Sequence, residues 1–382
     1  MPVRPCLRLD PVERFCQVRT MFGGADRSTL DGRLRAAARP SPLSAFRVAD
    51  WWQFKLPPPL ALFLGTLVAA GKPLMPRWLD MLALLAAIAA CAAFVSVIND
   101  YFDQEEDARS GKANRVAALS PGLVRTMALL PVAAGVTIAF LWRGEPLALI
   151  LYAASWIAFT AYSAPPLRLK TRGLWGVVAD AAGSTVFPVL LAVTLAGRTG
   201  ASAFDPSWVA AAAAWAAGWG MRGILWHQAL DAASDQQGSV RTFVQRRGSR
   251  AALLLGRGVA LPLELIGLFF LLTLGGSVAP IIFLGIYFGV VAGRSRLWGI
   301  ADKRPLYLGE YYDGLLPLAM IAASALRFPA DWLLLIPYFM LFGRRPARVL
   351  YHAVKLSWDL VRWTAYRGHL AVSGVRRRFR TG

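Results

Sequence analysis

Carboxylate side chains gather in the segment NDYFDQEED, residues 99–107, which directly follows a long apolar run. On a helix, Asn99, Asp103 and Asp107 recur every four residues, so their oxygen atoms share one face. Acidic side chains at the mouth of a membrane segment are costly unless cations hold them there. Oxygen ligands of this kind suit Mg²⁺, which commonly joins one or two carboxylates to the phosphates of a substrate. The spacing therefore predicts a metal-binding face at this membrane exit.

A second acidic pair follows another apolar run, in the segment HQALDAASDQQG. Asp231 and Asp235 are again four residues apart, and His227 lies one turn earlier on the same face. Two such clusters predict a site for Mg²⁺ and a diphosphate. For His227 three roles stay open: a phosphate contact, help in deprotonating an acceptor, or a hydrogen-bonded helix residue. The residues expected to carry catalysis are Asp103, Asp107, Asp231 and Asp235.

Cations and hydroxyl groups follow the fourth apolar run, in YSAPPLRLKTRG, residues 162–173. Two prolines break the helix there and set an extended turn. Cations and hydroxyls stabilise a diphosphate leaving group, whose negative charge grows as the C–O bond breaks. The alternative is a positively charged membrane anchor with a proline turn. The expected diphosphate contacts are Tyr162, Ser163, Arg168 and Lys170.

The composition is that of a membrane protein. Of 382 residues, 56% are hydrophobic and 17% are charged, and the mean hydropathy is +0.46. The apolar runs are long enough to span a bilayer. The predicted fold class is therefore all-α, a multi-pass membrane bundle of about nine to ten spans. The expected elements lie near 56–71, 78–98, 123–142, 145–163, 175–197, 207–228, 252–274, 278–293, 309–326 and 328–342.

Basic residues are distributed unevenly among the loops, and the formal net charge is +20. The connections after the second, fourth, sixth and eighth elements are rich in Lys and Arg, whereas the opposite connections are poor in them. The positive-inside rule therefore places both acidic clusters on the cytoplasmic side of the cell membrane. The basic residues do not alternate with aromatic residues as in a stacking platform, so we expect no nucleic-acid partner.

The chain divides into three parts. Residues 1–45 are expected to form a disordered, basic cytoplasmic tail, and residues 46–342 the membrane domain. Residues 343–382 are expected to form a basic amphipathic extension, because Leu350, Val354 and Trp358 recur at helical spacing. Such a helix favours an interface rich in anionic lipid. A solvated helix, or one that packs in an oligomer, is the alternative.

Three motifs, NDYFDQEED, YSAPPLRLK and DAASDQQGSVRT, occur in this order between hydrophobic pairs, and residues 45–326 resemble the UbiA superfamily of intramembrane prenyltransferases. The YSAPPLRLK form is more similar to chlorophyll-synthase-like members than to the hydroxybenzoate enzymes. The resemblance implies a helical membrane fold with a central cavity that opens to the cytoplasm. It also implies two Mg²⁺ ions that bind an isoprenyl diphosphate. By matching position, the implied metal ligands are Asn99, Asp103, Asp107, Asp231 and Asp235. The resemblance implies Arg115, which follows the first acidic cluster, as a further diphosphate contact.

The expected function is Mg²⁺-dependent transfer of an isoprenyl group from an allylic diphosphate to a lipophilic acceptor within the membrane. Two other enzyme functions use the same kind of site: cyclisation of the isoprenoid by a UbiA-type terpene cyclase, and phosphoribosyl transfer to a polyprenyl phosphate. A cation or lipid transporter is the non-enzymatic alternative. It predicts charges along a path through the midplane of the membrane, whereas these acids gather at the ends of apolar runs.

Overall fold

The computed structural model describes residues 41–198, 205–238, 240–298 and 307–378. Within these ranges the chain is helical and has no strands, which confirms the predicted fold class. The basic tail expected over 1–45 lies outside the described residues up to residue 40. The α-helices are α3 (Val48–Lys55), α4 (Pro57–Ala69), α5 (Trp78–Phe102), α6 (Gln104–Ser110), α7 (Pro121–Phe140), α8 (Pro146–Ser163), α9 (Leu174–Ala181), α10 (Phe187–Gly197), α11 (Pro206–Gln237), α12 (Phe243–Leu255), α13 (Leu261–Leu274), α14 (Ala279–Trp298), α15 (Leu316–Ala325), α16 (Leu335–Phe342) and α17 (Arg344–Arg378).

Every expected apolar segment coincides with helical structure: most with one α-helix, some with a π-helical turn as well, and the one near 328–342 with a 3₁₀ helix (Pro329–Leu334) followed by α16. Within the part of the chain that the structure describes, five stretches are long and apolar enough to cross a membrane: Met75–Phe102, Pro121–Phe140, Pro146–Ser163, Leu174–Gly197 and Phe243–Leu274. The last expected element, Pro329–Phe342, is a shorter apolar helix. The total of nine to ten spans therefore stays a prediction.

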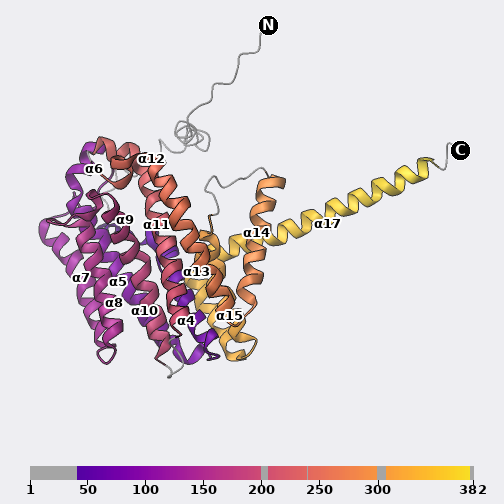
Figure 1. Ribbon diagram of the computed structural model, residues 1–382, viewed down its shortest axis with the longest axis horizontal. Helices are drawn as coiled ribbons and strands as arrows, with labels where there is room; N and C mark the ends of the chain where they lie inside the picture. The colour runs from indigo at the N-terminus through magenta and orange to yellow at the C-terminus, as the bar shows by residue number, and fades with distance from the viewer. Residues whose placement is uncertain (1–40, 199–204, 239, 299–306, 379–382) are drawn as a thin grey trace, which may run out of the picture. The chain divides into compact units, whose positions relative to one another are not determined.

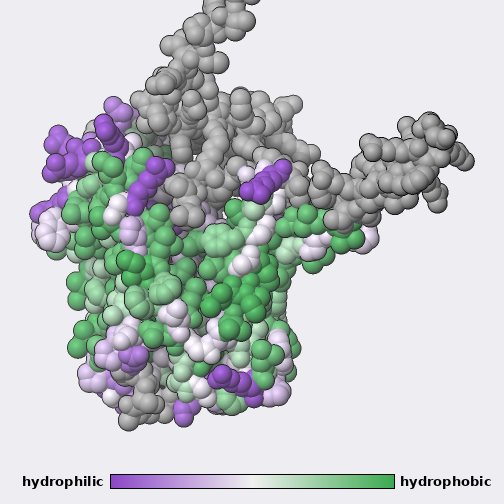
Figure 2. Space-filling model, turned by 45° about the vertical axis from the view of Figure 1, so that its right-hand side comes forward, coloured by the Kyte–Doolittle hydropathy of each residue, from purple (hydrophilic) through white to green (hydrophobic). Residues whose placement is uncertain are grey.

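The outer surface of the bundle is apolar over much of its height. Leu130, Ile157 and Phe269 are 57%, 67% and 61% exposed, respectively. Figure 2 shows apolar side chains across the middle of one face, with hydrophilic side chains toward both ends. Exposed apolar surface of this extent marks contact with a membrane. The protein is therefore an integral membrane protein.

The main core forms around α4, whose residues from Pro57 to Val68 are all buried. This helix contacts α10 and α15 along its length. Figure 1 shows α5, α7, α8, α10, α11 and α13 running alongside one another. Proline stands in the first turn of α4, α7, α8 and α11, where no backbone N–H is needed for an intrahelical bond.

Close backbone contact joins α11 to α13. A Cβ atom placed on Gly267 would lie 2.2 Å from the backbone nitrogen of Trp215. A Cβ atom on Gly218 would lie 2.3 Å from the backbone nitrogen of Glu264. Small residues at a helix interface allow such an approach within a membrane.

A buried ion pair lies at the same interface. Arg222 Nε of α11 is 2.7 Å from Glu264 Oε2 of α13, and the Tyr312 hydroxyl donates to Glu264 Oε1 at 2.9 Å. Glu264 is 0% exposed. The ion pair offsets a charge that would otherwise be costly inside the membrane, and these contacts connect α11, α13 and the π-helical turn η6 (Tyr311–Leu315).

Three connections meet at the end of the bundle that carries α6 and α12 (Figure 1). One is the turn predicted from the two prolines, in which Ala164 is extended and Arg168 is left-handed with φ of 38°. Arg246 Nε of α12 donates to the backbone oxygen of Thr171 at 2.9 Å, so the α12 end is fastened to this turn. Lys112, in the connection after α6, contacts Asp231 on α11. These contacts hold the three sequence motifs around one mouth.

Candidate active site

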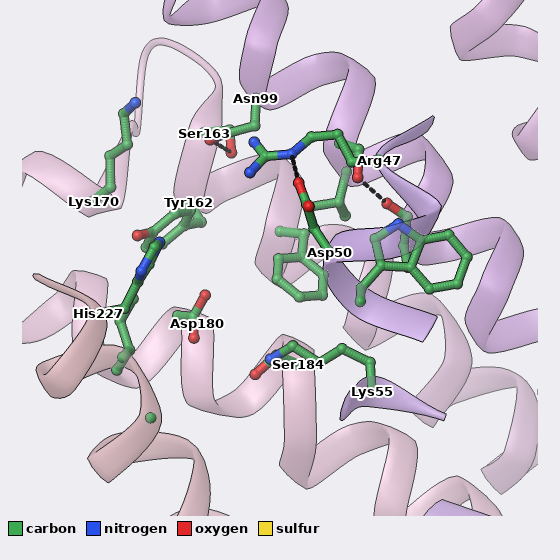
Figure 3. Close-up of a pocket in the computed structure, with 18 of the residues that line it drawn as sticks. Arg47, Asp50, Lys55, Asn99, Tyr162, Ser163, Lys170, Asp180, Ser184 and His227 are labelled. Carbon is green, nitrogen blue, oxygen red and sulfur yellow. Dashed lines mark hydrogen bonds and ion pairs between the residues drawn. The ribbon is translucent and has the colours of Figure 1, made fainter. Parts of the chain in front are cut away.

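A cavity of about 1010 Å³ opens at this end of the bundle, lined by residues of α3, α5, α8, α9 and α11. Both acidic clusters line it. Tyr162, Ser163 and Lys170 line it as well (Figure 3). The deeper lining includes apolar side chains such as Ile88, Val95 and Leu191. The cavity thus joins a charged mouth to an apolar interior, as a ligand with a charged head and an apolar chain requires.

The first acidic cluster lies at a break between two helices. The spacing predicted one helical face for Asn99, Asp103 and Asp107, but α5 ends at Phe102 and α6 begins at Gln104. The Asp103 backbone has φ of −103° and ψ of 2° there. Hydrogen bonds from Asp103 N to Asn99 O (3.0 Å) and from Asp107 N to Asp103 O (2.8 Å) still follow the four-residue pattern. The three side chains therefore still line the same cavity.

The second cluster lies near the C-terminal end of α11. His227, Asp231 and Asp235 all line the cavity, and His227 Nε2 is 4.0 Å from Asp231 Oδ2. Lys112 Nζ lies 3.0 Å from Asp231 Oδ2 and 3.9 Å from Asp235 Oδ1. Asp235 lies past the apolar part of α11, and burial raises the pKa of its carboxyl group to about 6, while Lys112 opposes this shift.

The cations from the proline turn contact the first cluster. Lys170 is buried and contacts the Asp103 carboxylate, and its Nζ is 3.5 Å from Glu106 Oε2. Arg168 Nη2 donates to Asp103 Oδ1 at 3.1 Å and to Glu106 Oε2 at 2.9 Å. Lys170 lines the cavity, whereas Arg168 reaches the same acids without belonging to the described lining. Of the expected diphosphate contacts, Arg168 is thus the one placed behind the carboxylates.

A second group of charges comes from α3 and the α6–α7 connection. Arg115 Nη2 donates to Asp50 Oδ2 at 3.2 Å, and its backbone N–H donates to Asp100 Oδ2 at 3.3 Å. Arg47 bridges the two acids, at 3.0 Å from Asp50 and 3.1 Å from Asp100 (Figure 3 shows the Arg47–Asp50 pair). Asp100 belongs to the first acidic motif, but its contacts link α3 and the α6–α7 connection to α5. Arg115 lines the cavity beside it.

Asp180 lines the cavity as well, and sequence reasoning missed it. Its signal is an acidic residue inside the apolar run 174–197, where a charge is costly and marks a function. Asp180 belongs to neither acidic motif, so spacing within a motif does not find it.

The donor set fits a divalent cation. Carboxylates from α5, α6 and α11 face one cavity, and the ammonium groups of Lys112 and Lys170 contact them there. Each acidic cluster therefore already lies beside a positively charged group. Among the described residues, no three acidic, histidine or cysteine side chains converge as a ready-made metal site. Mg²⁺ usually takes only one or two carboxylates and fills its other positions with water and phosphate.

Comparisons with known proteins agree with this geometry. The model of the UbiA prenyltransferase family matches residues 59–306, more than half of the chain. A search of curated proteins found no match. A solved UbiA homolog from Archaeoglobus fulgidus bound to GPP and Mg²⁺ is similar in fold, with 17% identity, a TM-score of 0.50, and coverage of 75% of this chain and 100% of that one. The structure of a UbiA homolog from the same organism bound to DMAPP and Mg²⁺ has 15% identity and a TM-score of 0.46, covering 84% of this chain and 99% of that one.

The expected superfamily is confirmed by the family match, whereas the similarity to chlorophyll-synthase-like members stays a prediction. The three motifs lie around one cavity within an all-α membrane bundle. On the family match, the chain belongs to the UbiA prenyltransferase family.

Proposed function

We propose that the protein transfers an isoprenyl group from an allylic isoprenyl diphosphate to a lipophilic acceptor within the membrane, with Mg²⁺ as cofactor. The observation that carries the proposal is the shared cavity: carboxylates from separate helices face a mouth that continues into an apolar interior. Family membership supports prenyl transfer, and the UbiA homologs with similar folds were solved with isoprenyl diphosphates and Mg²⁺.

Asn99, Asp103 and Asp107 would hold Mg²⁺ on one side of the mouth, and Asp231 and Asp235 on the other. Bound Mg²⁺ supplies charge neutralisation for the diphosphate.

The chain's own residues bind the leaving group and protect the reacting carbon. Lys170, Tyr162 and Ser163 line the mouth, where their N–H and O–H groups can donate to phosphate oxygens as negative charge grows. The apolar lining takes the isoprenyl chain and keeps water from the allylic cation. Aromatic rings in the lining, such as Phe159, stabilise that cation through their faces.

We place the mouth on the cytoplasmic side, because the loops beside it carry most of the Lys and Arg residues. The diphosphate then enters from the cytoplasm and the acceptor from the bilayer.

The test is Mg²⁺-dependent release of pyrophosphate by the full chain in nanodiscs with geranyl, farnesyl or geranylgeranyl diphosphate, with membrane extract as the acceptor source. Asp103→Asn and Asp231→Asn keep side-chain size and remove charge. We expect each to lower release at least about 100-fold, because charge stabilisation at the leaving group is lost. The matched control is Glu105→Gln, whose acid pairs with Arg109 at 86% exposure and does not belong to the described lining.

Release that persists in both aspartate variants, or that needs no Mg²⁺, would contradict the proposal. Product mass then separates transfer from cyclisation, and consumption of a phosphoribosyl donor would favour the remaining enzyme alternative. Ion or lipid uptake into vesicles without any turnover would favour a transporter.

A further inference from the structure

Asp180 lies in the last turn of α9, within a stretch long and apolar enough to span the membrane. The π-helical turn η4 (Ala182–Val186) follows it directly. Turns of this kind inside α-helices are frequent at functional sites, because they redirect side chains at some cost in helix geometry. An acidic side chain in a membrane segment generally faces a cavity and serves a function. Asp180 does line the cavity.

Polar groups of η4 surround the carboxylate. Ser184 lies near Asp180 in the lining, and the Ser184 and Thr185 hydroxyl oxygens are 3.0 Å apart. All three side chains line the cavity. Lys55 of α3 and His227 of α11 are near enough to interact electrostatically with Asp180. In Figure 3, Asp180 lies between His227 and Ser184, with Lys55 beyond Ser184.

This polar group lies deeper than the acidic clusters. A Cβ atom on Gly220 of α11 would lie 3.0 Å from the Cα atom of Ala181 and 2.9 Å from Thr185 Oγ1, so η4 is level with Gly220. Asp231 is eleven residues further along the same helix. At 1.5 Å per residue, the backbone of η4 lies about 16 Å deeper than Asp231 along the helix axis. Asp180 lies between this turn and His227 and belongs to neither acidic cluster.

The charges of this deeper part are nearly balanced. Lys55 supplies a cation to this part of the lining, and two hydroxyl groups complete the polar surface. A carboxylate accepts hydrogen bonds and repels anions, so this surface favours an uncharged ligand that donates an O–H group.

Building on the proposed function, we propose that Asp180, Ser184 and Thr185 form the site that binds the polar end of the acceptor, and that the acceptor is a lipophilic alcohol or phenol. Asp180 accepts a hydrogen bond from its hydroxyl group. This places the acceptor oxygen inside the cavity, shielded from the aqueous mouth where the diphosphate binds. Asp180 thus determines acceptor specificity and takes no part in holding the metal.

The test uses photolabelling by two probes of equal chain length, hexadecanol and hexadecanoate, each with a diazirine close to the polar end. The full chain is placed in detergent micelles with Mg²⁺ and geranylgeranyl thiolodiphosphate, an analogue that resists ionisation. We expect hexadecanol to label the peptide that contains Asp180 to Thr185 at least about tenfold more than hexadecanoate does. Asp180→Ala should lower hexadecanol labelling by a similar factor, and Asp180→Asn by less, since the amide still accepts a hydrogen bond.

Stronger labelling by hexadecanoate, or labelling unchanged in Asp180→Ala, would overturn the inference. Binding of the labelled thiolodiphosphate to the same variants is measured in parallel. Normal Mg²⁺-dependent binding in Asp180→Ala shows that the variant is folded and that the metal site is intact. Absence of that binding in the unmodified chain would count against the proposed function itself, so the two failures are distinguishable.

Discussion

At the scale of single residues, the site is held together by lysines that contact the acids. Lys112 Nζ joins the connection after α6 to Asp231 and Asp235 on α11. Lys170 joins the proline turn to Asp103, between α5 and α6, and to Glu106 of α6. The two acidic clusters thus face each other with their charges partly balanced within the chain.

Replacing Lys112 by methionine tests this balance. Without the ammonium group, the repulsion between Asp231 and Asp235 is less opposed, so the Mg²⁺-free protein should lose a little stability. Because Lys112 is 37% exposed, the loss should be less than about 1 kcal/mol. We expect a lower Tm without Mg²⁺ and a larger increase in Tm when Mg²⁺ is added, measured by thermal unfolding in detergent.

Arg109→Met is the control, because Arg109 pairs with the exposed Glu105 on the same segment. Its response to Mg²⁺ should equal that of the unmodified chain. An equal response in Lys112→Met would show that the lysine does not compete for the metal site.

Residue types and spacing were enough to find both acidic clusters, because each cluster lies within two turns of one chain segment. The pairing of Lys112 with α11 was not accessible in this way, since the two residues are 119 positions apart and meet only through the packing of α6 on α11. Contact of Arg168 with the diphosphate stays a prediction; the sequence does not predict its left-handed backbone or its hydrogen bonds to Asp103 and Glu106. That backbone conformation is uncommon for a residue with a side chain, and composition does not predict it.

At the scale of elements, the site depends on how closely α11 approaches its neighbours. The C-terminal end of α11 carries the second acidic cluster, while its middle packs against α13 and η4. The apolar runs of the sequence predicted both helices. It could not predict their contact, which depends on Gly218 and Gly267 and on the pairing of Arg222 with Glu264.

Gly267→Ala tests this approach. The added methyl group would lie 2.2 Å from the backbone nitrogen of Trp215, so the two helices must separate. Overpacking of this kind costs about 1–3 kcal/mol. We expect a clear decrease in Tm, together with lower pyrophosphate release as α11 shifts.

Gly285→Ala in α14 is the matched control, because a Cβ atom there would have no atom within 4 Å. Alanine favours the helix over glycine by about 0.5–1 kcal/mol, so this variant should be as stable as the unmodified chain or slightly more stable. Equal stability of both variants would argue against the close contact of α11 and α13.

At the scale of the whole molecule, the helix α17 packs on the bundle with one side and leaves apolar side chains exposed on another side. The helix α17 is 35 residues long, where an amphipathic helix was predicted from residue 343. Leu356 packs on Gly293 of α14, and Arg294 of α14 contacts His352, so one side of α17 is covered. Tyr351, Val354 and Trp358 form an apolar stripe on another side and are 65%, 70% and 63% exposed. These apolar side chains are exposed, so packing against the bundle does not account for their presence on α17.

We expect the stripe to lie in the interface of a membrane that contains anionic lipid. Val354→Cys, labelled with an environment-sensitive dye in a chain without Cys6 and Cys16, should show a blue-shifted emission in nanodiscs with phosphatidylglycerol. The shift should be smaller with phosphatidylcholine alone and should decrease at high salt. Ser357→Cys, an exposed position beside the stripe, should shift less. Equal emission at both positions, whatever the lipid, would instead favour a solvated helix.

On the proposed function, the lysines that contact the acids also bear on how the metal and the diphosphate would bind. Lys112 and Lys170 would compete with Mg²⁺ for the carboxylates, and once Mg²⁺ replaced them there, their ammonium groups would be free to donate to phosphate oxygens. Binding of the metal and of the diphosphate would therefore be coupled, and by linkage each ligand would raise the affinity for the other by the same factor.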